Sequence, residues 1–274
     1  MQVTAIKTPI IEKSQDLFAI LKDALDEPLR EKEIICVTSK VVALEQGRIV
    51  KLSEVKPSAK SRKMKKLKYS SDFDTQPELA ELILQEADKL FEAEYIYLAL
   101  KDNIFIPNAG IDLSNAPGGY AILWPEDSWG WVRDFREKLR SDYKVEELGV
   151  VVTDSHCNPL RRGVTGLALA YSGFEGVQSE IGKKDLFGKA LRITEKAVAD
   201  SLATAAILVM GESAECTPFT LIREAPIIFT NREIDPLETF INPKIDLFAG
   251  IYSEGFKKKL DIPMKHIPTS DDEK

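Results

Sequence analysis

The chain has 274 residues, of which 44% are apolar and 30% charged, and its net charge is −7. This balance is typical of a soluble globular protein with its own core, and the negative charge argues against non-specific binding to nucleic acid. Three scattered cysteines, without a CxxC pair, argue against a disulfide framework and a zinc ribbon and favour the reducing cytoplasm.

The start of the chain predicts two buried strands with a helix between them. Residues 2–6 and 34–38 are short apolar runs of the kind that form core strands. The first run lacks the charged start and the long apolar core of a secretion signal. Apolar residues at helical spacing follow Ser14, a good N-cap, so we expect a helix to begin there. A second helix is expected over 75–91, with Pro77 in its first turn.

The second half of the chain mixes strands and helices in the same way. A hairpin is expected to turn at 101–103, between two short apolar runs. A helix after Pro125 leads into a strongly apolar strand over 147–154. The last long helix is expected over 194–210, and its apolar stretch is too short to span a bilayer, so no membrane role is expected. Residues 227–274 predict more strand and loop and end in a polar tail that we expect to be disordered.

Together these elements predict an α/β chain of the mixed, α+β kind, in which mixed sheets carry packed helices. Neither GxGxxG nor GxxxxGK[ST] occurs in the sequence, so no Rossmann or P-loop nucleotide site is expected. We expect residues 1–226 to form a catalytic region and residues 227–274 to extend it.

Three acidic residues share one setting, because each stands in a small-residue turn that follows an apolar element. They are Asp112, Asp154 and Glu212. Carboxylate oxygens in such turns are typical ligands of Mg²⁺ and Mn²⁺, which complete their shells with water and phosphate oxygens. Taken singly, each acid is more often a turn former or a helix cap.

Other kinds of catalysis have few candidate residues. His156 and His266 are the two histidines of the sequence, which is too few for His-rich zinc chemistry and leaves little for a Ser-His-Asp triad. Cys157 would act as a nucleophile only beside a base that activates it.

A basic stretch at 60–68 runs against the acidic balance of the chain. One interpretation is a solvated loop, and the other is a flap that meets an anionic substrate or product. In the second interpretation, Lys63, Lys65 and Lys66 contact the substrate.

Five sequence blocks in one order indicate a relationship. They are TSKVVALEQGRIV (38–50), PELAELILQEA (77–87), NAGIDLSN (108–115), TDSHCNPLRRGVTGLAL (153–169) and DLFGKALRITEKAVADSLATAAILVMGES (185–213). Through them the chain resembles the coenzyme F-420-0:γ-glutamyl ligase family from Thr8 to Arg223. The resemblance implies a homodimeric ligase that uses GTP or ATP to add L-glutamate to a small carboxylate acceptor through an acyl phosphate. It also implies two divalent metal ions, Mg²⁺ or Mn²⁺, with K⁺ as a further candidate cofactor.

The resemblance implies a set of site residues as well. Asp112 and Asp154 match the ligands of the first metal, and Ser155 and Glu212 match those of the second, so the three acids are the candidate catalytic residues. Nucleotide contacts are implied for Thr8, Pro9, Ile10, Ile11, Ser39, Lys40, Asn115, Met210, Gly211, Glu212 and Ser213. His156 and Arg161 stand in a neighbouring block and are candidate substrate contacts.

Two departures from the family pattern leave the acceptor open. Leu44 replaces a lysine that is usual in a nucleotide-binding segment, and 156–158 replace an aromatic-Gly-Arg sequence. The acceptor can therefore be coenzyme F-420-0 or a folate, since relatives have an inferred role in folate γ-glutamylation. Two other functions also stay open: an inactive homologue that binds nucleotide or metal, and a metal-dependent nucleotide phosphohydrolase.

Overall fold

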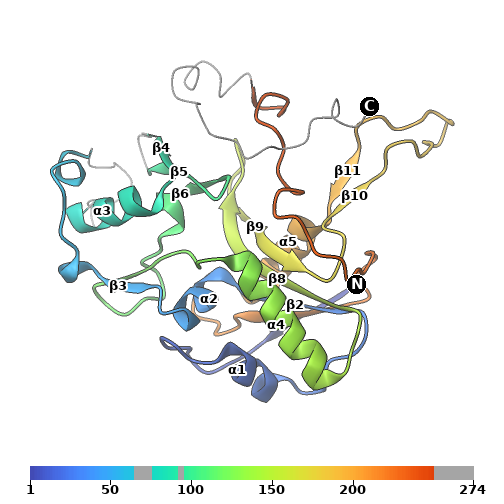
Figure 1. The fold of residues 1–274 in the computed structure, drawn as a ribbon, viewed down its shortest axis with the longest axis horizontal. Coiled ribbons are helices and arrows are strands. Elements are labelled where there is room, and N and C mark those ends of the chain that lie inside the picture. Colours follow the sequence, from blue (N-terminus) through green and yellow to red (C-terminus); the bar gives the residue numbers. More distant parts are fainter. Residues whose placement is uncertain (65–75, 92–95, 250–274) are drawn as a thin grey trace. The chain divides into compact units, whose positions relative to one another are not determined.

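A five-stranded sheet in the order β1-β12-β2-β8-β9 forms the centre of the fold in the computed structural model (Figure 1). The structure describes residues 1–64, 76–91 and 96–249. Strands β2 and β8 run parallel, and every other pair in this sheet is antiparallel. The strand bounds are β1 (Gln2–Ile6), β2 (Glu33–Thr38), β8 (Leu148–Cys157), β9 (Val164–Ser172) and β12 (Phe219–Arg223).

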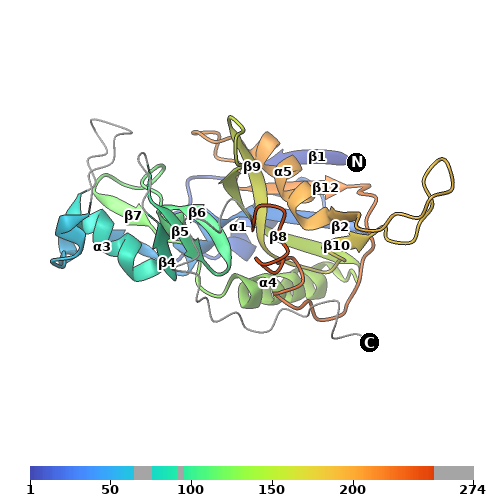
Figure 2. The same ribbon diagram turned by 90° about the horizontal axis from the view of Figure 1, so that it is seen from above.

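Helices cover both faces of this sheet (Figure 2). On one face, alternate side chains of β2 and β8 enter a core shared with α1 (Leu17–Ala24) and α4 (Ser128–Tyr143). On the other face, α5 (Val198–Met210) packs so closely on β9 that a Cβ at Gly166 would lie 2.2 Å from the backbone of Ala203. The strands β2 and β8 are therefore buried on both sides, which explains their continuous apolar runs.

One small sheet packs beside α5, whereas the other two form a second layer of structure around α3 (Pro77–Glu86) (Figure 1). Their apolar side chains make a separate core that includes Leu52, Ile83, Tyr97 and Ile111. The helix α2 (Ser39–Glu45) follows β2 directly. The small-sheet strands are β3 (Ile49–Lys51), β4 (Lys89–Phe91), β5 (Leu98–Lys101), β6 (Ile104–Pro107), β7 (Tyr120–Ile122), β10 (Val177–Ser179) and β11 (Glu195–Ala197). Short 3-10 helices lie at η1 (Leu52–Glu54), η2 (Ser61–Lys63) and η3 (Asn108–Gly110).

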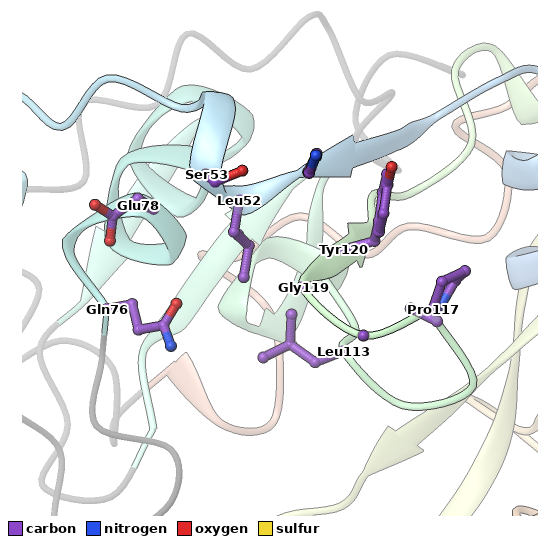
Figure 3. A pocket seen from close by; sticks show the side chains of 11 residues that line it. Leu52, Ser53, Gln76, Glu78, Leu113, Pro117, Gly119 and Tyr120 are labelled. Carbon is purple, nitrogen blue, oxygen red and sulfur yellow. The ribbon is translucent and has the colours of Figure 1, made fainter.

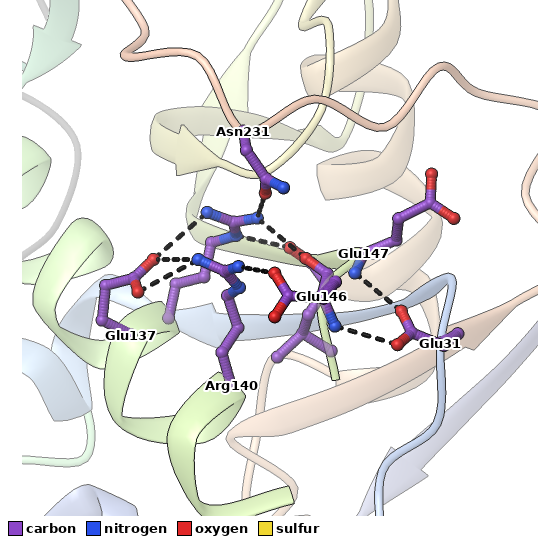
Figure 4. A network of polar contacts seen from close by, with 8 residues as sticks. Glu31, Glu137, Arg140, Glu146, Glu147 and Asn231 are labelled. Atoms are coloured by element: carbon purple, nitrogen blue, oxygen red, sulfur yellow. Dashed lines mark hydrogen bonds and ion pairs between the residues drawn. The ribbon is translucent and has the colours of Figure 1, made fainter. Parts of the chain in front are cut away.

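Two arginines of α4 tie that helix to the start of β8 (Figure 4). The guanidinium of Arg136 donates to the carbonyl oxygen of Leu148 over 2.6 Å and to the side chain of Asn231. Arg140 pairs with Glu137 and with Glu146. Because Arg136 is buried, these partners satisfy a charge that would otherwise cost stability. The network fixes the near end of β8, and Asp154 lies toward the far end.

The predicted mixed α/β fold is confirmed, but four element boundaries were wrong. The first helix is capped by Asp16, whose carboxylate accepts from two backbone N–H groups; Ser14 has a positive φ and lies outside it. The helix expected over 75–91 ends at Glu86, because the residues that follow pair as β4 with β5. The last helix begins four residues later than expected, since β11 pairs with β10. The strand expected to end at 154 continues to Cys157.

The chain divides into two compact units, Met1–Glu233 and Ile234–Lys274. In the second unit the described residues, 234–249, form a series of turns. The predicted boundary at 226 stays a prediction, and the predicted disordered tail lies outside the described residues. Among the helices of the described residues, none is long and apolar enough to cross a membrane.

Candidate active site

The carboxyl ends of β2 and β8 bring two parts of the site to one edge of the central sheet. Their parallel register pairs Thr38 with Thr153. Ser39 and Lys40 at the start of α2 therefore lie beside Asp154, the next residue of β8. The register of β8 with β9 shifts at this point, where two residues of β8 face three of β9. Such bulges redirect side chains near functional sites.

Asp154 is held by three donors, two of which come from other parts of the chain. The indole N–H of Trp124 donates to its Oδ2 over 2.6 Å, and the backbone N–H of Ser155 donates to its Oδ1 over 2.8 Å. The side chain of Ser39 is a third hydrogen-bond partner. These contacts fix the direction of the carboxylate.

Asp112 lies opposite, in a turn that Lys40 joins to α2. The ammonium of Lys40 is 2.7 Å from Oδ2 of Asp112 and 3.2 Å from the carbonyl oxygen of Ser114. The backbone N–H of Ser114 also donates to Oδ1 of Asp112 over 2.7 Å. A hydrogen bond within the turn therefore stabilises it, and the ion pair with Lys40 joins it to the start of α2.

Glu212 completes the acidic group from the end of α5. That helix stops at Gly211, which has a positive φ of 79°. The side-chain amide of Asn115 donates to the carbonyl oxygen of Ser213 over 2.8 Å, which joins this loop to the Asp112 turn. Segments far apart in the sequence are in this way fixed around one space.

That space is a cavity of about 390 Å³, here called the acidic cavity. Ser39 lines a neighbouring cavity instead, but every other residue predicted for the metals or the nucleotide lines this one. They are Thr8, Pro9, Ile10, Ile11, Lys40, Asp112, Asn115, Asp154, Ser155, Met210, Gly211, Glu212 and Ser213. The roles of these residues stay predictions, but the fold does bring the residues together.

The carboxylates of the acidic cavity repel one another. Burial raises the pKa of Asp154, and the charge of Asp112 raises it further, against the hydrogen bonds that lower it. Burial also raises the pKa of Glu212, as do the charges of Asp154 and Asp112, while Lys40 lowers it. Among the described residues that line the cavity, Lys40 is the one basic side chain. The site therefore favours a further positive charge.

The side-chain oxygen atoms of the acidic cavity are of the kind that bind a hard divalent cation. Three carboxylates and the Ser155 hydroxyl are the oxygen ligands that Mg²⁺ and Mn²⁺ take, and their mutual repulsion is what a cation relieves. Among the described residues no three His, Cys, Asp or Glu side chains converge closely enough to hold a metal ion as they stand. Lys40 forms an ion pair with Asp112, and the indole N–H of Trp124 donates to Asp154.

A smaller cavity of about 170 Å³ adjoins the acidic cavity and is here called the Trp124 cavity. Trp124 itself, 3% exposed, was not predicted from the sequence. Thirty residues separate it from Asp154, so no local pattern could indicate their contact. Gly110 lies against its ring with a φ of +75°, and a Cβ there would be 2.5 Å from ring atoms.

A third cavity, of about 420 Å³, is lined in part by the residues that follow Asp112 in the chain (Figure 3). Leu52, Leu113 and Tyr120 line it, and its charged lining residues are Lys51 and Glu78. The cavity is slightly larger than the acidic cavity, but it lacks a convergent group of acids. We therefore place the chemistry in the acidic cavity.

The predicted substrate contacts that the structure describes, which are His156, Arg161 and Lys63, are not among the residues that line the acidic cavity. His156 follows Asp154 but does not line the acidic or the Trp124 cavity. Its Nδ1 is buried without a hydrogen bond, and burial lowers its pKa against the charge of Asp200 on α5. Arg161 is exposed in the turn between β8 and β9, and Lys63 is exposed at the end of η2. Lys65 and Lys66 lie outside the described residues.

Comparison with known proteins gives the same relationship across most of the chain. The model of the family described as F420-0:Gamma-glutamyl ligase matches residues 5–224. A coenzyme F420:L-glutamate ligase of Methanopyrus kandleri is 33% identical over 78% of this chain and 82% of its own length. The enzyme of that name from Haloarcula marismortui is 34% identical over 82% of this chain and 87% of its own. That from Methanothermobacter thermautotrophicus is 31% identical over 88% and 96%. The chain therefore belongs to the F420-0:γ-glutamyl ligase family, a family of glutamate ligases.

Proposed function

We propose that this protein joins L-glutamate to the carboxylate of a small acceptor, with GTP or ATP as the source of energy. The observation that supports it most is that Asp112, Asp154 and Glu212 line one cavity, within a chain that belongs to this family. The acceptor is of the coenzyme F-420-0 type or the folate type. The protein acts in the cytoplasm on these small molecules.

The acidic cavity has room for the phosphate chain of a nucleotide. Asp112, Asp154, Ser155 and Glu212 would hold two divalent cations there, which neutralise charge on phosphoryl oxygens when bound. The ammonium of Lys40 stands among the acids and can bind a phosphate oxygen in place of Asp112.

The proposed reaction has two steps that balance. An oxygen of the acceptor carboxylate attacks the γ-phosphorus, and the bond to the β,γ-bridging oxygen breaks and releases a nucleoside diphosphate. The neutral α-amine of glutamate then attacks the acyl carbon, the bond to phosphate breaks, and the nitrogen loses a proton. The residues around Asp154 contribute by holding the reacting groups in line rather than by covalent chemistry.

The position of Leu44 bears on the nucleotide. It lies in α2, is 7% exposed and forms part of the wall of the acidic cavity. A lysine at position 44 would place a second basic side chain in the cavity beside Lys40. With Leu44 there, Lys40 is the one basic side chain among the described lining residues. We infer that this protein depends more on Lys40 and on divalent cations than relatives with the additional lysine do.

We also propose that the protein is a homodimer whose interface lies beside the acidic cavity. Ile10, at the rim of the cavity, is 77% exposed, and Leu208 on α5 is 84% exposed. Large apolar side chains that stand in water near a site favour a subunit contact. The neighbours of Leu208 in α5, Ile207 and Met210, line the cavity.

Mass spectrometry of the products tests the proposed function. The purified protein is incubated with glutamate, Mn²⁺ or Mg²⁺, GTP or ATP, and either coenzyme F-420-0 or tetrahydrofolate. We expect one acceptor to gain glutamyl units and Asp154→Asn to lower that rate by about a hundredfold or more with the fold intact. Phosphate release without a glutamylated product would instead indicate a phosphohydrolase, and no turnover an inactive homologue. Near-normal activity of the variant would remove Asp154 from the site.

A further inference from the structure

The acidic cavity and the Trp124 cavity share a wall. Lys40, Asp112, Asp154 and Ser155 line both. In the proposed ligase these residues surround the transferred phosphoryl group, so a group in the Trp124 cavity would meet it from another side than the nucleotide does. Phosphoryl transfer requires the attacking and leaving oxygens to lie roughly in line across the phosphorus. A second cavity at this wall is where the attacking substrate is expected.

The size of the Trp124 cavity limits what it can hold. Its volume of about 170 Å³ is less than half that of the acidic cavity, which is about 390 Å³. Of the two cavities, the acidic cavity is the one with more room for a nucleotide. The Trp124 cavity can therefore bind one end of a larger substrate, while the rest of that substrate lies outside the cavity.

The walls of the Trp124 cavity favour one carboxylate on an apolar stem. Ile111, Leu123 and Trp124 form its buried sides, and the polar groups gather at the wall that it shares with the acidic cavity. Free glutamate carries an ammonium and two carboxylates, and placing all three against these sides would cost more than placing one. An acceptor end would keep its stem on the apolar sides and present its carboxylate to the shared wall.

The mouth of the Trp124 cavity lies at the end of the β8–β9 pair. Cys157 and Val164 face each other there in the antiparallel register, and both line the cavity and are exposed. The turn that joins them carries Arg161 and Arg162, which are exposed as well. An anionic acceptor that leaves the cavity by this mouth would pass these two guanidinium groups.

We propose that the Trp124 cavity is the acceptor subsite and receives the carboxylate end of the acceptor between Trp124 and the pair Cys157–Val164. This inference rests on the proposed ligase function, and it adds where each substrate binds. The nucleotide occupies the acidic cavity, and the rest of the acceptor extends over the β8–β9 turn.

The chain carries a natural reporter in each cavity. Cys157 lines the Trp124 cavity and Cys216 lines the acidic cavity, and both thiols are exposed. Cys36 is fully buried, and burial raises the pKa of its thiol, so it should not react in the folded protein and serves as the internal control. Alkylation by iodoacetamide, followed peptide by peptide in a mass spectrometer, therefore reports on the two cavities separately.

We expect coenzyme F-420-0 to slow alkylation of Cys157 about tenfold or more while Cys216 reacts as before. Mn²⁺ with GTP should protect Cys216 and leave Cys157 reactive. Protection of Cys157 by glutamate alone, or by Mn²⁺ with GTP alone, would overturn the assignment. So would an unprotected Cys157 in a sample that forms glutamylated product. Absence of product from both acceptor types would count against the ligase itself, whereas protection is read from binding and does not need turnover.

Two variants of equal side-chain size separate the cavities further. Val164→Trp places a ring at the mouth of the Trp124 cavity, and Ala214→Trp places one in the lining of the acidic cavity. Both positions are exposed, so the fold should tolerate the larger ring. Val164→Trp should raise the KM for the acceptor about tenfold and leave the KM for GTP within about twofold, and Ala214→Trp should do the reverse. Equal effects of Val164→Trp on both constants would contradict the subsite.

Discussion

The direction of the Asp154 carboxylate depends on Trp124. Its indole N–H is one of the donors that fix the carboxylate, and the ring is buried with 3% exposure. A hydrogen bond of this kind orients a ligand without touching the substrate's reacting atoms.

Trp124→Phe should lower kcat about tenfold, because the ring stays while the donor to Asp154 is lost. The matched control is Trp131→Phe, which removes an indole donor to Glu45 at 2.6 Å. The Trp131 indole does not line the acidic or the Trp124 cavity, so kcat should stay close to that of the unchanged protein. Steady-state kinetics of both variants gives the answer, and equal losses would show that Trp124 acts only through stability.

Gly110→Ala should destabilise the protein by about 2 kcal/mol or more. The residue has a φ of +75°, and its new Cβ would meet the ring of Trp124 at 2.5 Å, so strain and overlap add. Gly118→Ala is the control, because a Cβ there meets no atom within 4 Å. Its effect should stay within about 0.5 kcal/mol. Urea unfolding measures both, and a tolerated Gly110→Ala would mean that Trp124 moves freely.

The helix α3 holds the segment that enters the basic stretch. The carboxylate of Glu81 accepts from the backbone N–H of Ser58 over 2.8 Å, and Ser58 and Ser61 contribute side-chain hydrogen bonds. The hydrogen bond from the Ser58 side chain is the main cause that lowers the pKa of Glu81, from 4.5 to about 2. A folded pKa below the unfolded one adds stability above pH 4.5 that is lost as the pH falls toward 2.

Glu81→Gln should therefore reduce stability at neutral pH, and the difference from the unchanged protein should shrink between about pH 5 and pH 2. Chemical unfolding at several pH values measures this. Glu54→Gln, in the exposed part of η1, should not change the pH profile. A difference between Glu81→Gln and the unchanged protein that is constant with pH would contradict the role of Glu81.

The periodic spacing of apolar residues predicted most helices and strands. It failed where a segment pairs as a strand with another segment of the chain. Residues 195–197 fit a helical pattern, yet they form β11 because a second strand lies beside them in the fold. Leu90 fits the stripe of α3 and also the alternation of β4, and its pairing with Ala99 decides between the two. The three acids could be chosen from their turns, whereas Trp124 could not, because its contact with Asp154 exists only after folding.

At the scale of the whole molecule, the proposed dimer interface contains the exposed apolar side chain of Leu208. Leu208→Lys should shift the protein from dimer to monomer without loss of fold, because Leu208 is 84% exposed and supports no core. Light scattering after size-exclusion chromatography measures the mass. Ile228→Lys, at a residue that is 59% exposed, is the control and should leave the dimer intact. A monomeric unchanged protein would contradict the proposed dimer.

The central claim is that the acidic cavity activates an acceptor carboxylate with the terminal phosphoryl group of a nucleotide. Labelling that carboxylate with oxygen-18 tests this directly, since the label leaves with the phosphate when glutamate displaces it. We expect the first glutamyl unit added to release one phosphate that carries one labelled oxygen from the acceptor carboxylate, as read by mass spectrometry. Unlabelled phosphate accompanying a product with one added glutamate would contradict the acyl phosphate route.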